Sequence, residues 1–159
     1  MTIRPINAED TQTLLDVIRR ACATVAKRFA LTPENCPRSP AFYTINRLEE
    51  DINRGIRYYL LEEDADVRGC VALEGAKPDV CYLERLAVLP KHRSKGLGTA
   101  LVQHAFTEAG TLGAKRIEIG IIAEDTELKE WYRRFGFVLT GTKTFDHLPF
   151  VVAFMAKKL

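Results

Sequence analysis

One short segment strongly limits how this chain can fold, because it joins an apolar run to a basic turn that contains glycine. Residues 86–89 are apolar, Pro90 stops the run, and residues 91–95 include three cations. Gly96 and Gly98 then open a stretch with helical spacing. Glycine leaves the backbone accessible, and the first amides of a helix have no partner within it. The pattern therefore predicts a strand, a turn and a helix N-terminus suited to an anion such as a pyrophosphate.

The spacing excludes two common phosphate-binding loops. A Walker loop needs a lysine between its last glycine and a serine or threonine, whereas Thr99 directly follows Gly98. The dinucleotide fingerprint needs a third glycine at the position of Leu101, and no acidic residue ends a second strand about 20 residues further on. What remains is Arg93-x-x-Gly96-x-Gly98 after a strand.

This remaining pattern resembles the acyl-CoA-binding signature of the GNAT superfamily of N-acyltransferases. A second segment agrees with it, because Tyr132 stands near the expected end of a helix and Gly136-Phe137 opens a strand, as in that family's later motif. The two segments lie at the family's usual separation. The resemblance covers the last half of the chain firmly and the first half loosely. It implies an enzyme that transfers an acetyl group from acetyl-CoA to a primary amine.

The resemblance also implies a fold. It predicts an α/β protein with a GNAT-like mixed, mostly antiparallel sheet of six to seven strands, splayed parallel strands 4 and 5, and about four flanking helices. Hydrophobic periodicity and turn residues indicate strands over 3–6, 57–62, 67–74, 80–89, 115–122, 137–140 and 150–157. Helices with their caps and stops are expected within 7–25, 39–55, 98–110 and 125–136. The segment 31–40 has three prolines and is expected to be a loop, the first place to look for a substrate lid.

The cofactor-binding residues follow from the same resemblance. Backbone groups of the fourth strand are expected to pair with the pantetheine arm, much as an added strand would. The amides of the turn are expected to hold the pyrophosphate. The expected cofactor-binding residues are Leu86, Ala87, Val88, Arg93, Ser94, Lys95, Gly96, Leu97, Gly98 and Thr99.

Two side chains are expected to handle protons during acetyl transfer. Tyr132 matches the family tyrosine near the departing thiolate, and a phenol with a pKa of about 10 can donate a proton at neutral pH. Glu84 is the candidate base for the acceptor amine, since it is a lone carboxylate in the strand that lines the reaction centre. An amide at Leu86 or Ala87, aimed by a local distortion of the strand, is expected to stabilise the oxyanion.

Each assignment has an alternative that the sequence leaves open. Family members often carry the strand glutamate two residues earlier, where this chain has Tyr82, so Tyr82 or a water chain could replace Glu84. Glu84 could instead form a structural ion pair with an arginine, and Tyr132 could be a core tyrosine. Where many relatives have asparagine at the cap of the fourth helix, this chain has Asp125, which adds negative charge near the cofactor. Ser94 stands where glycine is frequent.

Composition favours a single domain over residues 1–159, with 47% hydrophobic and 28% charged residues. A net charge of +2 is too small to indicate nucleic acid as a partner, and no apolar run approaches a membrane span. We expect a cytoplasmic protein. The four cysteines are widely spaced and have no histidine at metal-ligand separation, so reduced thiols and no metal are expected.

Two other function classes remain compatible with the sequence. The first is a non-catalytic acyl-CoA-binding sensor that keeps the nucleotide cradle without turnover. The second is a nucleotide-binding module of another kind, which would bind ATP or NAD. For the enzyme, direct attack in a ternary complex without a covalent enzyme intermediate is expected, with a small-molecule or protein amine as acceptor. A homodimer is expected to form through the apolar final strand.

Overall fold

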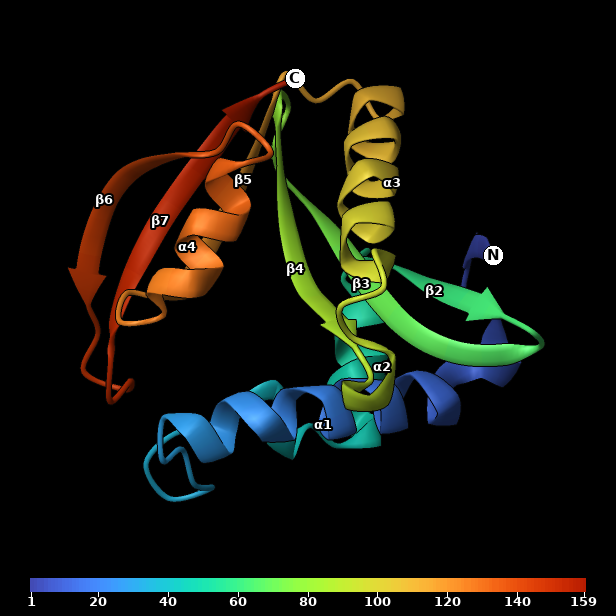
Figure 1. Cartoon of the computed structure of the whole chain (residues 1–159), viewed down its shortest axis with the longest axis horizontal. Helices are drawn as coiled ribbons and strands as arrows, with labels where there is room; N and C mark the ends of the chain where they lie inside the picture. Colours follow the sequence, from blue (N-terminus) through green and yellow to red (C-terminus); the bar gives the residue numbers. More distant parts are fainter.

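The computed structural model describes residues 1–159 as one seven-stranded sheet with helices on both faces (Figure 1). The strands are β1 (Thr2–Pro5), β2 (Arg57–Glu63), β3 (Asp66–Lys77), β4 (Val80–Val88), β5 (Arg116–Ile122), β6 (Val138–Thr144) and β7 (Val151–Lys158). The helices are α1 (Thr11–Arg28), α2 (Ile45–Asn53), α3 (Leu97–Thr111) and α4 (Thr126–Arg133). Three short 3-10 turns are η1 (Ala8–Asp10), η2 (Pro40–Phe42) and η3 (Pro90–His92). The predicted fold class is confirmed.

The sheet splits in the middle. Its strand order is β1-β2-β3-β4-β5-β7-β6, and every neighbouring pair is antiparallel except β4 and β5. These two parallel strands pair only over residues 80–82 and 116–118. Beyond that point they diverge, as Figure 1 shows. The β5-facing edge of β4 is therefore unpaired from Leu83 onward, and the predicted splay is confirmed.

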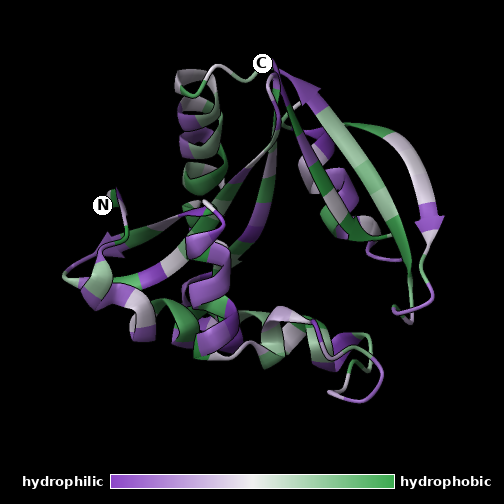
Figure 2. Cartoon of the chain, turned by 180° about the vertical axis from the view of Figure 1, so that it is seen from behind, coloured by the Kyte–Doolittle hydropathy of each residue, from purple (hydrophilic) through white to green (hydrophobic).

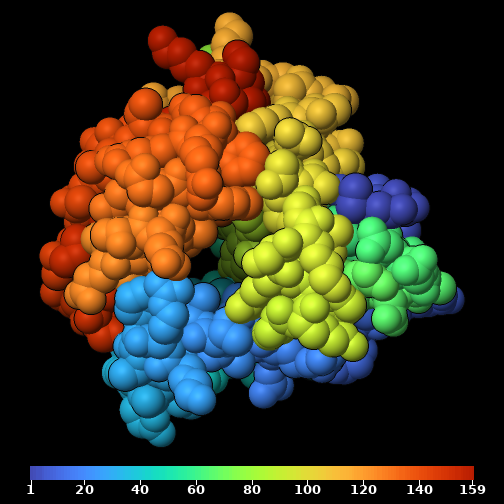
Figure 3. Space-filling model, in the orientation of Figure 1, coloured from blue at the N-terminus to red at the C-terminus, as the bar shows by residue number.

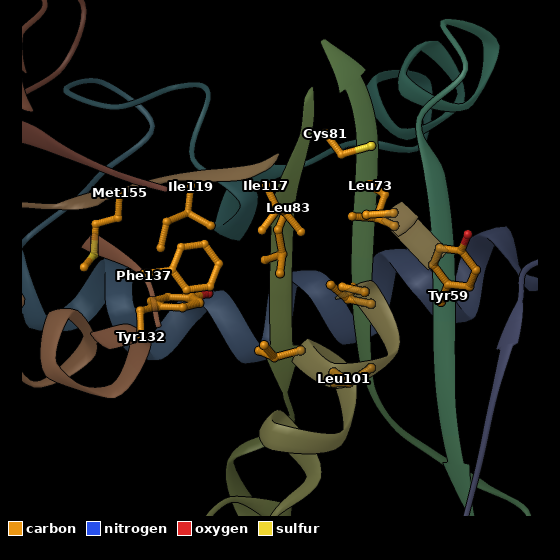
Figure 4. Close-up of a cluster of buried hydrophobic side chains, with 14 of the residues drawn as sticks. Tyr59, Leu73, Cys81, Leu83, Leu101, Ile117, Ile119, Tyr132, Phe137 and Met155 are labelled. Carbon is orange, nitrogen blue, oxygen red and sulfur yellow. The ribbon is translucent and has the colours of Figure 1, made fainter. Parts of the chain in front are cut away.

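Each face of the sheet has its own hydrophobic core. On one face, α3 and α4 cover a cluster that includes Leu83, Leu101, Ile117, Phe137 and Met155 (Figure 4). On the other face, α1 and α2 cover a second cluster. Its fully buried members include Leu14, Ile18, Leu48, Leu60 and Cys70. In Figure 2, α2 lies in front of the sheet and turns a mostly hydrophilic surface outward.

A β-bulge in β4 changes which core its side chains reach. Ala72 of β3 faces Glu84, and two residues earlier Cys70 faces Ala87, so β4 carries one extra residue between them. Arg85 takes up the distortion with a φ of 49°, a backbone conformation rare for a non-glycine residue. Leu83 packs in the core under α3, whereas Ala87, four residues later, packs in the core under α1. The bulge therefore reverses the alternation of side chains along the strand.

Local capping residues position two of the helices as the sequence predicts. The Asn7 side chain accepts a hydrogen bond from the Glu9 amide at 2.9 Å, and the Asp10 carboxylate accepts one from the Asn7 amide at 2.8 Å. This capping box starts the segment that continues into α1. The Asp125 carboxylate accepts a hydrogen bond from the Leu128 amide at 3.2 Å and caps α4.

Two helix predictions were wrong in their bounds. The helix expected within 39–55 is interrupted, because Tyr43 is extended (ψ 142°) and the Thr44 side chain caps a new helix, α2. The helix expected to stop at Gly110 continues through it to Thr111. Gly113, with a φ of 86°, provides the left-handed turn that follows. Ser39 does cap the first of these segments, whereas Gly110 is an ordinary helical residue.

The expected route to a dimer was also wrong in its geometry. The final strand β7 lies between β5 and β6, so both of its edges are already paired. The free edge in this half of the sheet belongs to β6, whose residues are all exposed. No helix combines the length and the apolar character needed to cross a membrane.

Candidate active site

A cavity of about 360 Å³ lies where the sheet splits. Four parts of the chain form its walls: α1, the end of β4, the turn that leads into α3, and α4. Figure 3 shows the surface hollowed between the end of α1 in light blue, the 90–99 segment in yellow-green and α4 in orange. All of the expected cofactor-binding residues except Lys95 line this cavity. The sequence prediction and the geometry therefore point to the same place.

The turn before α3 presents a run of unpaired amides. No hydrogen bond to another group of the chain is formed by the amides of residues 94–99. Left-handed backbone conformations at Ser94 (φ 62°) and Gly96 (φ 82°) shape this turn. Successive free amides at a helix N-terminus attract an anion, because the helix dipole adds to their partial positive charges. The turn can hold a diphosphate through the main chain alone.

Arg93 has a structural task in this turn. Its Nε donates to the Val88 carbonyl at 3.0 Å, Nη1 to the Thr24 hydroxyl at 2.9 Å and Nη2 to the Ala21 carbonyl at 2.8 Å. These bonds hold the end of β4 against α1. We expected the Arg93 charge to add to the anion-binding amides. The structure instead uses its side chain to close one wall of the cavity.

The opposite wall rests on a close contact between α3 and α4. A Cβ atom at Gly98 would lie 3.3 Å from the Trp131 ring. The missing side chain thus lets the indole approach the start of α3. Trp131 packs against the core, and its side chain also lines the cavity together with Leu128.

Cys22 lines the cavity from α1, next to Val25. Burial raises the pKa of its thiol to about 11, so the sulfur is protonated and apolar at neutral pH. Cys36 is buried in the 31–40 loop, and no residue of that loop lines the cavity. All four cysteines are free thiols, and no group of three or more His, Cys, Asp or Glu side chains is placed to hold a metal ion.

Glu84 lies outside the cavity lining, at the bulge and two residues before Leu86. Its Oε2 accepts a hydrogen bond from Arg85 Nη1 at 3.1 Å. The Glu84 side chain is 27% exposed. Its pKa is raised to about 7, mainly by burial and further by the nearby carboxyl of Glu74, while Arg85 acts in the opposite direction. Glu84 thus has the arginine contact expected of a structural ion pair and also the pKa near neutral pH expected of a base.

Arg85 is itself fixed by a buried polar cluster under α2. Its Nε donates to the Tyr43 hydroxyl at 2.7 Å, and its Nη2 lies 3.3 Å from Asp51 Oδ2. Asp51 is fully buried and also accepts hydrogen bonds from the hydroxyls of Tyr43 at 3.2 Å and Tyr58 at 2.9 Å. Burial opposes its charge, but Arg85, Arg54 and the Tyr58 hydroxyl lower its pKa. The strained bulge is thus tied to two neighbouring elements.

Tyr132 is buried in the core beside the cavity and is 5% exposed. Its ring makes edge contacts with Trp131 at 5.0 Å and Phe137 at 5.3 Å between centroids. Figure 4 shows its hydroxyl directed toward β4. This hydroxyl forms no hydrogen bond within the chain, and burial raises its pKa above the ordinary value. The phenol is therefore fully protonated at neutral pH and has a free donor.

An ion pair closes one end of the cavity. Arg28 Nη2 donates to Asp125 Oδ1 at 2.9 Å. Arg28 lies one turn beyond Val25 on α1, and Asp125 lies one turn before Leu128 of α4. The negative charge of Asp125 thus faces a cation and a helix N-terminus. No sequence pattern indicates this partner, because Arg28 and Asp125 are 97 positions apart.

Sequence reasoning also missed the α1 wall. Ala21, Cys22 and Val25 belong to the apolar stripe of the first helix, and hydrophobic periodicity cannot tell a core face from a cavity wall. Tyr82, the alternative base, is 37% exposed and does not line the cavity.

A split sheet with an amide-rich turn at the mouth of the split defines the N-acyltransferase class of folds. The model of the acetyltransferase (GNAT) family matches residues 23–137. The chain belongs to the GNAT family of acetyltransferases, which use an acyl-CoA donor.

Relatives of known sequence or structure agree with this assignment. The chain is 26% identical over 142 residues to the uncharacterized N-acetyltransferase YjgM of Escherichia coli (strain K12), covering 85% of this chain and 80% of that protein. Its fold is similar to that of PaiA N-acetyltransferase from Thermoplasma acidophilum in complex with coenzyme A, with a TM-score of 0.79, 20% identity and full coverage of both chains. It is also similar to YncA from Salmonella typhimurium with acetyl-CoA, with a TM-score of 0.75, 20% identity and coverage of 100% of this chain and 94% of that one.

Proposed function

We propose that this chain, as a single domain over residues 1–159, transfers an acetyl group from acetyl-CoA to a primary amine by direct attack in a ternary complex. The observation that carries the proposal is the continuity of two unpaired backbone surfaces. The free amides of residues 94–99 lie beside the free edge of β4, and both border the same cavity. The structures of PaiA with coenzyme A and YncA with acetyl-CoA support this choice of donor.

The backbone supplies the proposed cofactor contacts. The turn amides would hold the diphosphate, and the edge of β4 at Leu86, Ala87 and Val88 would pair with the amide groups of the pantetheine arm. The Val88 carbonyl already accepts a hydrogen bond from Arg93 Nε, so it does not take part in this pairing. The bulge at Arg85 alters the direction of the next peptide groups. An amide at Leu86 or Ala87 would therefore be free to donate a hydrogen bond to the oxyanion of the tetrahedral intermediate. Apolar side chains suffice here because the main chain makes the contacts.

Glu84 is the proposed general base. An alkylammonium has a pKa of about 10.4 in water and must lose a proton before its nitrogen can attack a thioester. A carboxyl whose pKa is about 7 accepts that proton more readily than an ordinary glutamate does. One ammonium proton passes to the Glu84 carboxylate directly or through a water, and the freed nitrogen lone pair attacks the thioester carbonyl. The nitrogen loses a second proton as the tetrahedral intermediate collapses to the amide, and this proton balances the one that the departing thiolate receives.

Tyr132 is the proposed acid. As the carbon–sulfur bond breaks, the electron pair stays on the sulfur, and the Tyr132 hydroxyl can donate a proton or a hydrogen bond to it. Its donor has no other partner in the chain, and its raised pKa keeps it protonated. The acceptor is proposed only as a primary amine, on a small molecule or a protein. A cytoplasmic location and a homodimer stay predictions.

Thermal denaturation with acetyl-CoA, CoA, ATP and NAD at equal concentrations tests the nucleotide assignment. A ligand at 100 times its Kd adds about 2.7 kcal/mol of stability, which is a visible rise in Tm. We expect this rise with the two CoA species only. A rise with ATP or NAD alone would favour the other kind of nucleotide-binding module.

Thiol release measured across a panel of amines then separates the enzyme from a sensor. We expect acceptor-dependent release of CoA thiol. Binding of acetyl-CoA without turnover of any amine, in a protein that keeps Glu84 and Tyr132, would favour the sensor.

A further inference from the structure

The base proposed above does not stand alone, because a second carboxyl shares its face of the sheet. In the antiparallel pairing of β3 and β4, Glu74 faces Tyr82 and Ala72 faces Glu84. Opposite residues of an antiparallel pair project to the same face, so Glu74 and Glu84 are diagonal neighbours on one face. Long side chains span this diagonal, and the Glu74 carboxyl contributes to the raised pKa of Glu84. Two neighbouring carboxylates repel each other when both are ionised, so the state in which the pair shares one proton is favoured.

The two half-buried carboxyls have different surroundings. Glu84 lies at the bulge, one residue from Arg85, whereas Glu74 lines a second cavity of about 330 Å³. That cavity lies at the opposite end of β4 from the first one, and its lining also includes Arg54, Arg57 and Lys77. Glu74 therefore connects the Glu84 carboxyl with a polar cavity outside the acyl-CoA cavity.

We propose that Glu74 is a positioning residue for the proton that Glu84 accepts, holding it in a carboxyl pair that opens to solvent through the second cavity. The inference rests on the proposed function, in which Glu84 takes the ammonium proton of the acceptor. The doubly ionised pair and R–NH₃⁺ give a pair that retains one proton, with a single negative charge, and R–NH₂. The retained proton leaves to water from the Glu74 side before the next turnover, so the cycle needs no other reactant.

Other charged groups face the pair from each neighbouring element, and they fix the sign of the expected effects. On β4 and α2, Arg85 and Arg54 favour ionised carboxyls, whereas Asp51 disfavours them. Arg85 donates a hydrogen bond to the Tyr43 hydroxyl, and the Tyr58 hydroxyl donates one to Asp51. The titratable and charged side chains around the pair include Arg85, Asp51, Arg47, Arg54, Tyr43 and Tyr58 near Glu84, and Arg57 and Lys77 near Glu74. Glu74 is the carboxyl diagonal to Glu84 on the neighbouring strand, so its neutralisation should lower the pKa of Glu84.

The test compares Glu74→Gln with Glu49→Gln, a matched control. Both remove one negative charge, but Glu49 is exposed on α2 and takes part in no ion pair. The pKa of Glu84 is read by ¹³C NMR of labelled glutamate carboxyls, and the acid limb of kcat/KM for the acceptor is measured on the same variants. We expect Glu74→Gln to move both to lower pH by about one pH unit or more. Glu49→Gln should leave both in place.

Unchanged midpoints in folded Glu74→Gln would overturn the inference. Glu74→Asp provides a second measurement if the glutamine variant does not fold, since it keeps the charge but withdraws the carboxyl by one methylene. It should give a smaller shift in the same direction, and an unshifted midpoint again contradicts the pair. Glu84→Gln distinguishes the two levels of the argument. Full activity in that variant would remove Glu84 as the base. The NMR titrations of the parent and of Glu74→Gln would still report whether Glu74 and Glu84 share a proton.

Discussion

Arg28 and Asp125 lie 2.9 Å apart and join the last turn of α1 to the cap of α4 across the split in the sheet. This is the single side-chain hydrogen bond between residues before α3 and residues after it. Asp125 caps α4 with the same oxygen that Arg28 contacts. The pair therefore links two halves of the molecule that otherwise meet through β4, β5 and α3.

Arg28→Ala should lower the free energy of unfolding by about 0.5–1 kcal/mol, since Arg28 is 54% exposed and solvent weakens the pair. Asp125→Ala should cost about 1 kcal/mol more, because it also removes the helix cap. Urea unfolding of both single variants and the double variant measures the coupling between the two residues. Equal losses in the two single variants would show that the cap contributes nothing.

The two glycines of the turn should respond differently to alanine. Gly96 has open space around its Cβ position but a left-handed backbone, so Gly96→Ala should cost about 1–2 kcal/mol of stability. Gly98 has ordinary helical geometry, but an added Cβ would press on Trp131 at 3.3 Å. Gly98→Ala should keep most of its stability and bind acetyl-CoA more weakly. Unfolding curves and isothermal titration calorimetry give the two quantities, and unchanged affinity in Gly98→Ala would count against a role for this contact.

Arg93→Lys should destabilise the protein even without ligand. One ammonium cannot reproduce a planar guanidinium that reaches Val88, Thr24 and Ala21 together. Loss of two such bonds costs about 1–3 kcal/mol. Thermal denaturation of the free protein measures this loss. If the variant were as stable as the parent, Arg93 would have to act mainly on the bound cofactor.

Tyr132→Phe should separate catalysis from folding. The Tyr132 hydroxyl has no hydrogen-bond partner in the chain, so its removal should change stability by less than about 0.5 kcal/mol. The proposed loss of a proton donor should slow turnover by a factor of about 10² or more. Stopped-flow thiol release and acetyl-CoA binding are measured together. Turnover at the parental rate would reduce Tyr132 to a core residue.

Glu84→Gln should change how stability depends on pH. The folded-state pKa of Glu84 is raised to about 7 from its ordinary value of 4.5, so between these values the folded state binds more protons than the unfolded state. Stability contributed by this group is thus lost as pH rises from about 4.5 to 7. At pH 8 the glutamine variant should be more stable than the parent by about 1–3 kcal/mol, with no difference below pH 4. Chemical denaturation at several pH values checks this sign.

The parts of the fold that were predictable from sequence depend on local interactions. The Asn7 and Asp125 caps and the two-glycine turn all act within a few residues, so their patterns are visible in the chain. The split of the sheet was expected from the family resemblance. The strand register near the hairpin of β2 and β3 follows from its short turn.

The features that sequence reasoning missed depend on distant partners. The bulge at Arg85 is held by Tyr43 and Asp51, which lie more than thirty positions away. The same holds for Cys22, whose helix face packs like a core face until β4 and α4 leave a gap beside it. The diagonal contact between Glu74 and Glu84 depends on the register in which β3 and β4 pair, and no pattern within either strand predicts that register.

The reversed alternation in β4 has a consequence for how this chain can vary. Deleting one residue from 84–87 would remove the extra residue, so that β4 could pair with β3 as a regular ladder in which Leu83 and Leu89 keep their present cores. The change in direction of the peptide groups after Arg85, where β4 reaches the cavity, would be lost. The length of this stretch therefore shapes the cavity wall more than it shapes the cores, and a deletion there should harm acetyl-CoA binding more than stability.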